Sequence, residues 1–74
     1  MESNEKEIIK KIEKLNVMNE NLLTIYEAAD YLGEAECEVA FKIENSEIDT
    51  FNYEDVDYID KENIIRILEG RINQ

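Results

Sequence analysis

Residues 22–33, LLTIYEAADYLG, constrain the fold more than any other stretch of the chain. Thr24 and Glu27 stand three residues apart, and this spacing predicts a capping box in which each side chain accepts a hydrogen bond from the main chain. Gly33 suits the position after a helix, where a positive φ is needed. A short helix over residues 25–32 therefore has both a start signal and a stop signal. Its predicted inward face is small and apolar: Ala28, Ala29 and Leu32.

The length allows one domain at most, because the chain has 74 residues. A chain of this size buries only about 60% of its unfolded surface, so the core is expected to be thin. An apolar fraction of 43% still favours a packed fold over disorder. Cys37 is the only cysteine, which excludes an intramolecular disulfide and favours a cytoplasmic protein. No apolar run approaches the roughly 18 residues of a membrane span, and no signal peptide is expected.

Amphipathic helices are predicted on either side of residues 25–32. Residues 4–15 place Ile8, Ile9, Ile12 and Leu15 in one stripe. This stripe packs either on the domain or against a second copy. A second helix over residues 35–45 is expected to turn Val39, Ala40 and Ile43 inward, and to leave Cys37 small and partly buried.

The spacing of apolar residues changes at residues 48–59, IDTFNYEDVDYI. Aromatic and β-branched residues there roughly alternate with polar ones, which predicts a hairpin with its turn near Glu54 and Asp55. Tyr53 and Tyr58 are expected to pack within this hairpin. Asp60 then caps a last helix over residues 61–69, which Gly70 ends. The fold class is therefore α+β, with an N-terminal helix and loop (residues 1–21) before a small winged helix-turn-helix domain (residues 22–74).

The chain resembles the excisionase and MerR-type winged-helix family. The resemblance covers residues 22–69, with its motifs in residues 22–33, at Val39, at Glu47–Ile48 and in residues 58–69, YIDKENIIRILE. It implies that the helix over residues 35–45 corresponds to the one that enters the DNA major groove, and that the hairpin corresponds to the wing that reaches the backbone.

The charge of this chain differs from what a DNA-binding member of that family would carry. The chain has 19 acidic and 8 basic residues, a net charge of −11, and residues 34–60 hold ten acids and a single base, Lys42. Binding to nucleic acid depends largely on cations that displace counterions from phosphate. Carboxylates at the positions that would face DNA disfavour direct binding. The residues predicted to contact a protein partner instead are Glu34, Glu36, Glu38, Phe41, Glu44, Glu47, Asp49, Glu54, Asp55 and Asp57.

Three functions stay open at this point. The first is an inhibitor or modulator of the phage or mobile-element type, whose carboxylates replace phosphates on a basic nuclease, repressor or similar protein. The second is an excisionase-like DNA-binding accessory protein or regulator that uses Lys6, Lys10, Lys11 and Lys14, and it gains if these share a face with Lys61 and Arg66. The third is a scaffold module that forms a homodimer through Ile8, Ile12 and Leu15.

Catalysis is not expected. The chain has no histidine, no glycine-rich phosphate loop and no serine in a nucleophile elbow. Asp55, Asp57 and Asp60 lack the glycine and the register of a calcium loop. No metal site and no cofactor are predicted.

Overall fold

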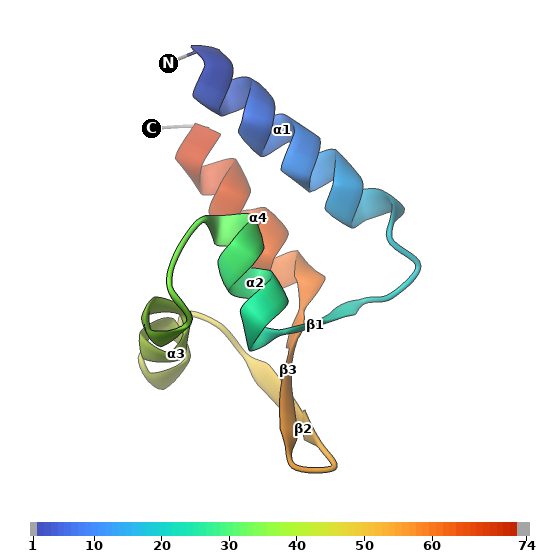
Figure 1. The fold of residues 1–74 in the computed structure, drawn as a ribbon, viewed down its shortest axis with the longest axis vertical. Coiled ribbons are helices and arrows are strands. Elements are labelled where there is room, and N and C mark those ends of the chain that lie inside the picture. Colours follow the sequence, from blue (N-terminus) through green and yellow to red (C-terminus); the bar gives the residue numbers. More distant parts are fainter. Residues whose placement is uncertain (1, 73–74) are drawn as a thin grey trace.

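The structure, a computed structural model, describes the main chain of residues 2–72 and the side chains of residues 5–72. The predicted α+β class is confirmed over these residues, and the arrangement is compatible with a small winged helix-turn-helix that carries an additional N-terminal helix (Figure 1). The elements in chain order are α1 (Glu2–Val17), β1 (Leu22–Thr24), α2 (Ile25–Leu32), α3 (Glu36–Glu44), β2 (Thr50–Tyr53), β3 (Val56–Asp60) and α4 (Lys61–Ile72).

The three strands form one antiparallel sheet in the order β1-β3-β2. Leu23 of β1 is opposite Ile59 of β3, and Thr50 of β2 is opposite the same Ile59 on the other side. The sequence analysis did not predict β1. Three residues are too few to show a period, so only the pairing with β3 reveals the strand.

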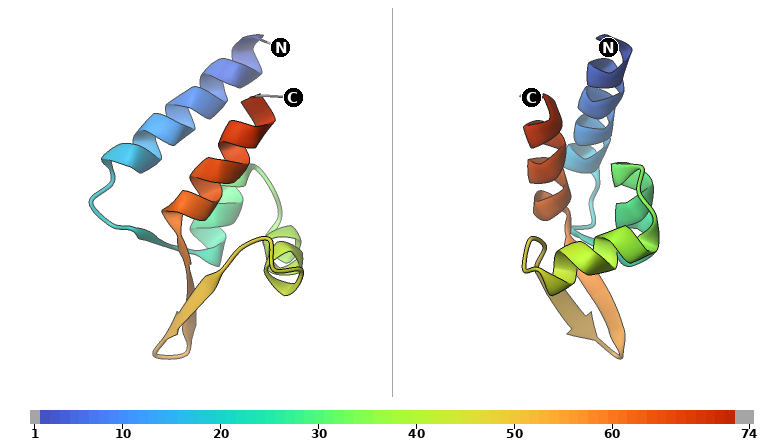
Figure 2. Two further views of the ribbon diagram at one scale, coloured as in Figure 1. Left: turned by 180° about the vertical axis from the view of Figure 1, so that it is seen from behind. Right: turned by 90° about the vertical axis from the view of Figure 1, so that its left-hand side faces the viewer.

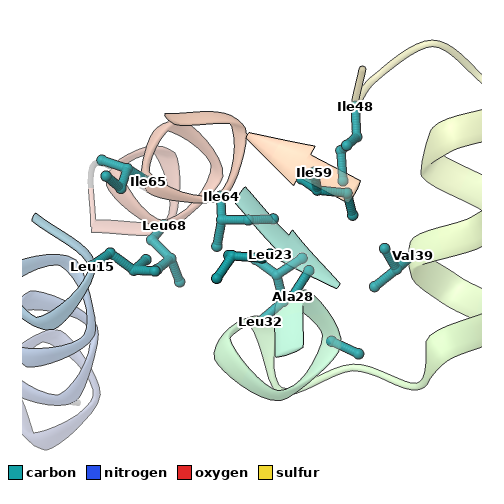
Figure 3. Packing of buried hydrophobic residues seen from close by; sticks show 11 residues of the cluster. Leu15, Leu23, Ala28, Leu32, Val39, Ile48, Ile59, Ile64, Ile65 and Leu68 are labelled. Atoms are coloured by element: carbon teal, nitrogen blue, oxygen red, sulfur yellow. The ribbon is translucent and has the colours of Figure 1, made fainter. Parts of the chain in front are cut away.

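Helices cover one face of the sheet and extend from one of its ends. Helix α1 runs antiparallel beside α4, and the start of α1 and the end of α4 lie at the end of the molecule opposite the hairpin (Figures 1 and 2). Figure 3 shows Val39 of α3, Ile48 and Ile59 meeting at one end of the core, and Leu15 of α1 contributing at the other end. The buried core consists of Leu15, Leu23, Ala28, Ala29, Leu32, Val39, Ile48, Ile59, Ile64, Ile65 and Leu68.

The predicted local signals of α2 are confirmed. The Thr24 Oγ1 atom accepts a hydrogen bond from the Glu27 main-chain N–H at 3.1 Å, and Glu27 Oε1 accepts one from the Thr24 N–H at 3.0 Å. Gly33 ends the helix with a φ of 67°. Asp60 caps α4 as expected, since its Oδ1 accepts from the Glu62 N–H at 2.9 Å.

Gly70 does not end the last helix, which is a correction to the sequence analysis. Helix α4 continues to Ile72. The Arg71 side chain explains the extension, because its Nη1 atom donates to the Leu32 main-chain oxygen at 2.7 Å and ties the last turn of α4 to the end of α2. Helix α1 is also longer than predicted, at residues 2–17 instead of 4–15.

The apolar stripe of α1 packs within the chain itself. Leu15 is fully buried, and Ile8 and Ile12 are partly buried against the core. The homodimer expected through these three side chains would therefore have to use a stripe that α4 and the core already cover. Ile9, at the edge of the stripe, stays 44% exposed.

No helix in the described residues combines the length and the apolar character needed to cross a membrane.

Candidate protein-binding surface

Helix α3 presents a row of carboxylates to solvent. Val39 is buried and Ile43 partly buried on the inner side, so Glu36, Ala40 and Glu44 fall in one row on the outer side at four-residue spacing. Ala40 is exposed, which corrects the prediction that it points inward. The reason is geometric, because residues four apart share a face and Ala40 follows the exposed Glu36.

A second exposed row, next to the first, contains Cys37 and Phe41. Cys37 is exposed and not partly buried as expected. Phe41 is 62% exposed and lies within one turn of Glu38 and Glu44 along α3. A large apolar side chain among carboxylates is a suitable anchor for a protein partner, because aromatic residues supply much of the binding energy at interfaces.

Glu38 has a structural role at the start of α3. Ala35 occupies the N-cap and has no side-chain acceptor, and the Glu38 Oε1 atom accepts a hydrogen bond from the Ala35 N–H at 3.0 Å. Glu38 is exposed as a whole residue. Its carboxylate is thus less free to reorient than those of Glu36 and Glu44.

Glu34 does not belong to the exposed acidic surface. Its side chain is only 14% exposed, and its two oxygens lie 2.9 Å from Lys42 Nζ and 2.7 Å from Arg71 Nη2. The ion pairs connect the turn before α3 with α3 itself and with α4. Lys42 is the one basic residue between residues 34 and 60, and its charge is already paired with Glu34. The exposed carboxylates of α3 and the hairpin therefore have no free cation within that segment of the sequence.

The hairpin adds exposed carboxylates at its tip. Glu54 and Asp55 form the turn, both with positive φ (50° and 67°), which is the geometry of a type I′ turn. Asp57 is exposed and accepts a hydrogen bond from Asn52 Nδ2 at 2.9 Å across the strands. Glu47 and Asp49, in the loop before β2, are exposed as well.

The structure thus places nine of the ten predicted residues at the surface of α3, the following loop and the hairpin. These elements lie away from the start of α1 and the end of α4 (Figure 2). We call this set the acidic α3–wing surface, and its members are Glu36, Glu38, Phe41, Glu44, Glu47, Asp49, Glu54, Asp55 and Asp57. Glu34 is the tenth predicted residue and is turned inward.

The sequence analysis missed the position of Lys61. This side chain is buried, and its Nζ atom donates to the main-chain oxygens of Leu15 at 2.9 Å and Met18 at 3.0 Å. The three donors of an ammonium group suit the carbonyls at the end of a helix, which have few main-chain partners. The Leu15 oxygen has one besides Lys61, because it also accepts from the Met18 N–H at 3.2 Å. Lys61 therefore holds the end of α1 and cannot share a DNA-facing surface with the lysines of α1.

The lysines near the end of α1 face acidic groups of α2. A hollow of about 280 Å³ between the two helices is lined by Lys11 and Lys14 together with Glu27 and Asp30. Lys14 Nζ also lies 6.0 Å from the centre of the Tyr31 ring, within the range of a cation–π contact. Lys6, Lys10 and Arg66 remain as exposed cations away from this hollow.

No group of three or more histidine, cysteine or acidic side chains within the described residues is arranged to hold a metal ion. Comparisons of the chain with family models, with curated proteins and with solved structures gave no match.

Proposed function

We propose that this chain binds a basic DNA- or RNA-handling protein through the acidic α3–wing surface and inhibits or modulates it. The observation that supports the proposal is the ion pair of Lys42, whose amino group donates hydrogen bonds to both oxygens of Glu34 at 2.9 and 3.1 Å. With that cation occupied, the exposed carboxylates of α3 and the wing present an uncompensated negative surface. In the winged-helix layout, a DNA-binding protein would present cations at these positions.

The chemistry of the surface suits lysine and arginine as partners. A carboxylate accepts charge-assisted hydrogen bonds from these side chains at about 2.7–2.9 Å, as a phosphate oxygen does. Complementary charge of this kind speeds association and makes it sensitive to salt. Phe41, exposed between Glu38 and Glu44, would supply the apolar contact that charge alone lacks.

The same charge opposes contact with duplex DNA. The Debye length at physiological salt is about 8 Å, so carboxylates held against a groove would lie within range of the phosphates. Purified protein is expected to show no retention of duplex DNA at about 50 mM salt, where non-specific binding is strongest. Retention under that condition would contradict the proposal and favour the excisionase-like alternative, which would rely on Lys6, Lys10 and Arg66.

The partner side of the proposal is tested with two variants that change the net charge equally. One carries Glu36→Lys with Glu44→Lys on α3, and the control carries Glu7→Lys with Glu13→Lys on the exposed side of α1. Each is used to capture proteins from cells that encode the chain, and binding of the captured protein is then titrated at several salt concentrations.

Wild type and the α1 control should retain a basic nucleic-acid-binding protein. The α3 variant should bind it at least about tenfold more weakly, which corresponds to about 1.4 kcal/mol. Equal binding by the two variants would show that the position of the carboxylates on α3 is irrelevant, and the proposal would fail.

A further inference from the structure

Strand β2 forms an open edge of the sheet. The strand order is β1-β3-β2, so β2 has a neighbouring strand on one side only. Among the described residues, no main-chain hydrogen bond joins β2 to a helix or a loop. The strand, TFNY, also contains no charged residue, although charges are a common protection of native edge strands. Its free side is therefore able to pair with another extended segment.

The register of the hairpin identifies the main-chain groups on the free side. Tyr53 and Val56 are opposite each other and flank a two-residue turn, so this pair exchanges main-chain hydrogen bonds. In an antiparallel ladder such pairs alternate with pairs that exchange none. Thr50 and Asn52 belong to the second kind. Their N–H and C=O groups consequently point away from β3, towards the open edge.

The side chains of β2 that point away from the core are apolar and exposed. Phe51 is opposite Tyr58, and these side chains point to the same side of the sheet. Phe51 is 54% exposed, Tyr53 66% and Val56 43%. Ile59, on the other side, is fully buried in the core. The exposure of Tyr53 corrects the expectation that it packs within the hairpin, whereas Tyr58 is half-buried as that expectation requires.

Carboxylates adjoin the open edge at both ends and on its core side. Two precede β2 in the loop after α3, two form the turn that follows it, and one is opposite Asn52 in β3. All five are exposed: Glu47, Asp49, Glu54, Asp55 and Asp57. Lys42, the one base of residues 34–60, is paired with Glu34 and does not neutralise them. The edge is therefore complementary in charge to a segment that carries lysine or arginine.

We propose that an extended basic segment of the partner protein adds to the three-stranded sheet at β2, as a fourth strand antiparallel to it. The inference rests on the proposed function and names how the wing would hold the basic partner. In this mode of recognition, main-chain hydrogen bonds supply affinity and alternate side chains supply specificity. A second copy of the chain does not suit the edge, because it would bring two sets of these carboxylates together in a chain of net charge −11.

The geometry of β2 also sets the pattern of the added segment. Residues opposite Thr50 and Asn52 would exchange hydrogen bonds with them and point to the same side, where Asp57 lies. Basic side chains suit those positions. The residues between them would point to the side of Phe51 and Tyr53, where apolar side chains are suited. The segment is thus expected to alternate basic and apolar residues, with the N–H groups of the basic residues facing β2.

The probe for this inference is the blocked peptide acetyl-KVRVKVR-amide, titrated into the full chain. Nuclear magnetic resonance should show saturable shifts of the Thr50 and Asn52 amides, and calorimetry gives the affinity. N-methylation of the lysines and arginines removes the N–H groups that face β2, and should weaken binding at least about tenfold. N-methylation of the valines keeps the charge and the edge-facing donors, and should leave the affinity unchanged. The acidic peptide acetyl-EVEVEVE-amide should not bind.

A matched pair of protein variants tests the edge from the other side. Asn52→Pro removes an N–H that points to the open edge without breaking a hydrogen bond to β3. Asn52→Ala removes the side-chain bond to Asp57 but keeps that N–H. The proline variant should bind the peptide at least about tenfold more weakly than the alanine variant. Far-ultraviolet circular dichroism should show both folded, and the dispersion of the β3 amide resonances should show that the hairpin is retained in both.

The outcomes separate this inference from others. Absence of peptide binding, equal affinity for the two methylated peptides, or equal affinity of the two Asn52 variants would overturn it. Shifts of the Thr50 and Asn52 amides that follow protein concentration without peptide would assign the edge to a second copy and would overturn it as well. The proposed function is tested separately, through capture of the partner by the Glu36 and Glu44 variant of α3. Either experiment can fail while the other succeeds, so the two failures are distinguishable.

Discussion

The side-chain amino group of Lys61 donates a hydrogen bond to the main-chain oxygen of Leu15 over 2.9 Å and thereby joins the start of α4 to the end of α1. The two residues are far apart in sequence, yet both are buried. Helix α1 is therefore held to the rest of the domain by a polar clamp as well as by its apolar stripe.

Replacing Lys61 by methionine should remove this clamp. The Leu15 and Met18 main-chain oxygens would each lose a donor. The Leu15 oxygen keeps the Met18 N–H at 3.2 Å, whereas the Met18 oxygen loses the lysine, and a shielded acceptor left without a partner costs about 1–3 kcal/mol. The free energy of unfolding in urea should fall by that amount. Arg66→Met, on the exposed side of the same helix, is the control and should change it little. Equal stability of the two variants would mean that the clamp contributes nothing.

Glu34→Gln should destabilise the fold by about 1 kcal/mol, since the two ion pairs with Lys42 and Arg71 are only partly exposed to solvent. Glu44→Gln removes an exposed carboxylate from the acidic α3–wing surface and should be neutral or slightly stabilising. Urea denaturation of both proteins measures the difference. A double-mutant cycle with Lys42→Met isolates one of the pairs, and a coupling energy of zero would refute its contribution.

The two glycines should respond to alanine in opposite directions. Gly70 lies inside α4 with open space around the position of a Cβ, so Gly70→Ala should stabilise the helix by about 0.5–1 kcal/mol. Gly33 has a φ of 67°, where an alanine costs about 1–2 kcal/mol. Thermal melting of the two variants should move above and below that of wild type, respectively. A rise in both melting temperatures would contradict the cap geometry assigned to Gly33.

The wing turn should become more stable with residues suited to its backbone. Glu54 and Asp55 both have positive φ, and Asn-Gly is the preferred pair in a type I′ turn. The double change Glu54→Asn with Asp55→Gly should raise the free energy of unfolding by up to about 1 kcal/mol. Asp57→Gly, in β3, should lower it instead, because Asp57 lies in a strand and accepts the Asn52 hydrogen bond. Amide hydrogen exchange at β2 and β3 reports both effects at the wing.

The sequence alone determined those local elements whose start and stop signals involve residues only a few positions apart. The Thr24–Glu27 capping box, the Gly33 stop and the Asp60 cap depend on main-chain groups one turn away, and all three are present. The apolar period also placed Leu32 and Val39 in the core. Most of the carboxylates predicted at the surface are there, because a charged side chain without a partner stays in water.

Only the tertiary structure decided which polar residues have partners and which apolar residues lack them. Glu34, Lys42 and Arg71 come together from three parts of the chain, and Lys61 reaches α1 across the sequence. The register of β2 against β3 likewise places Phe51 and Tyr53 on one face of the sheet, where both side chains are exposed. The physical reason is the same in each case: local periodicity fixes the direction of a side chain relative to its own element, whereas its partner is fixed by how distant elements pack.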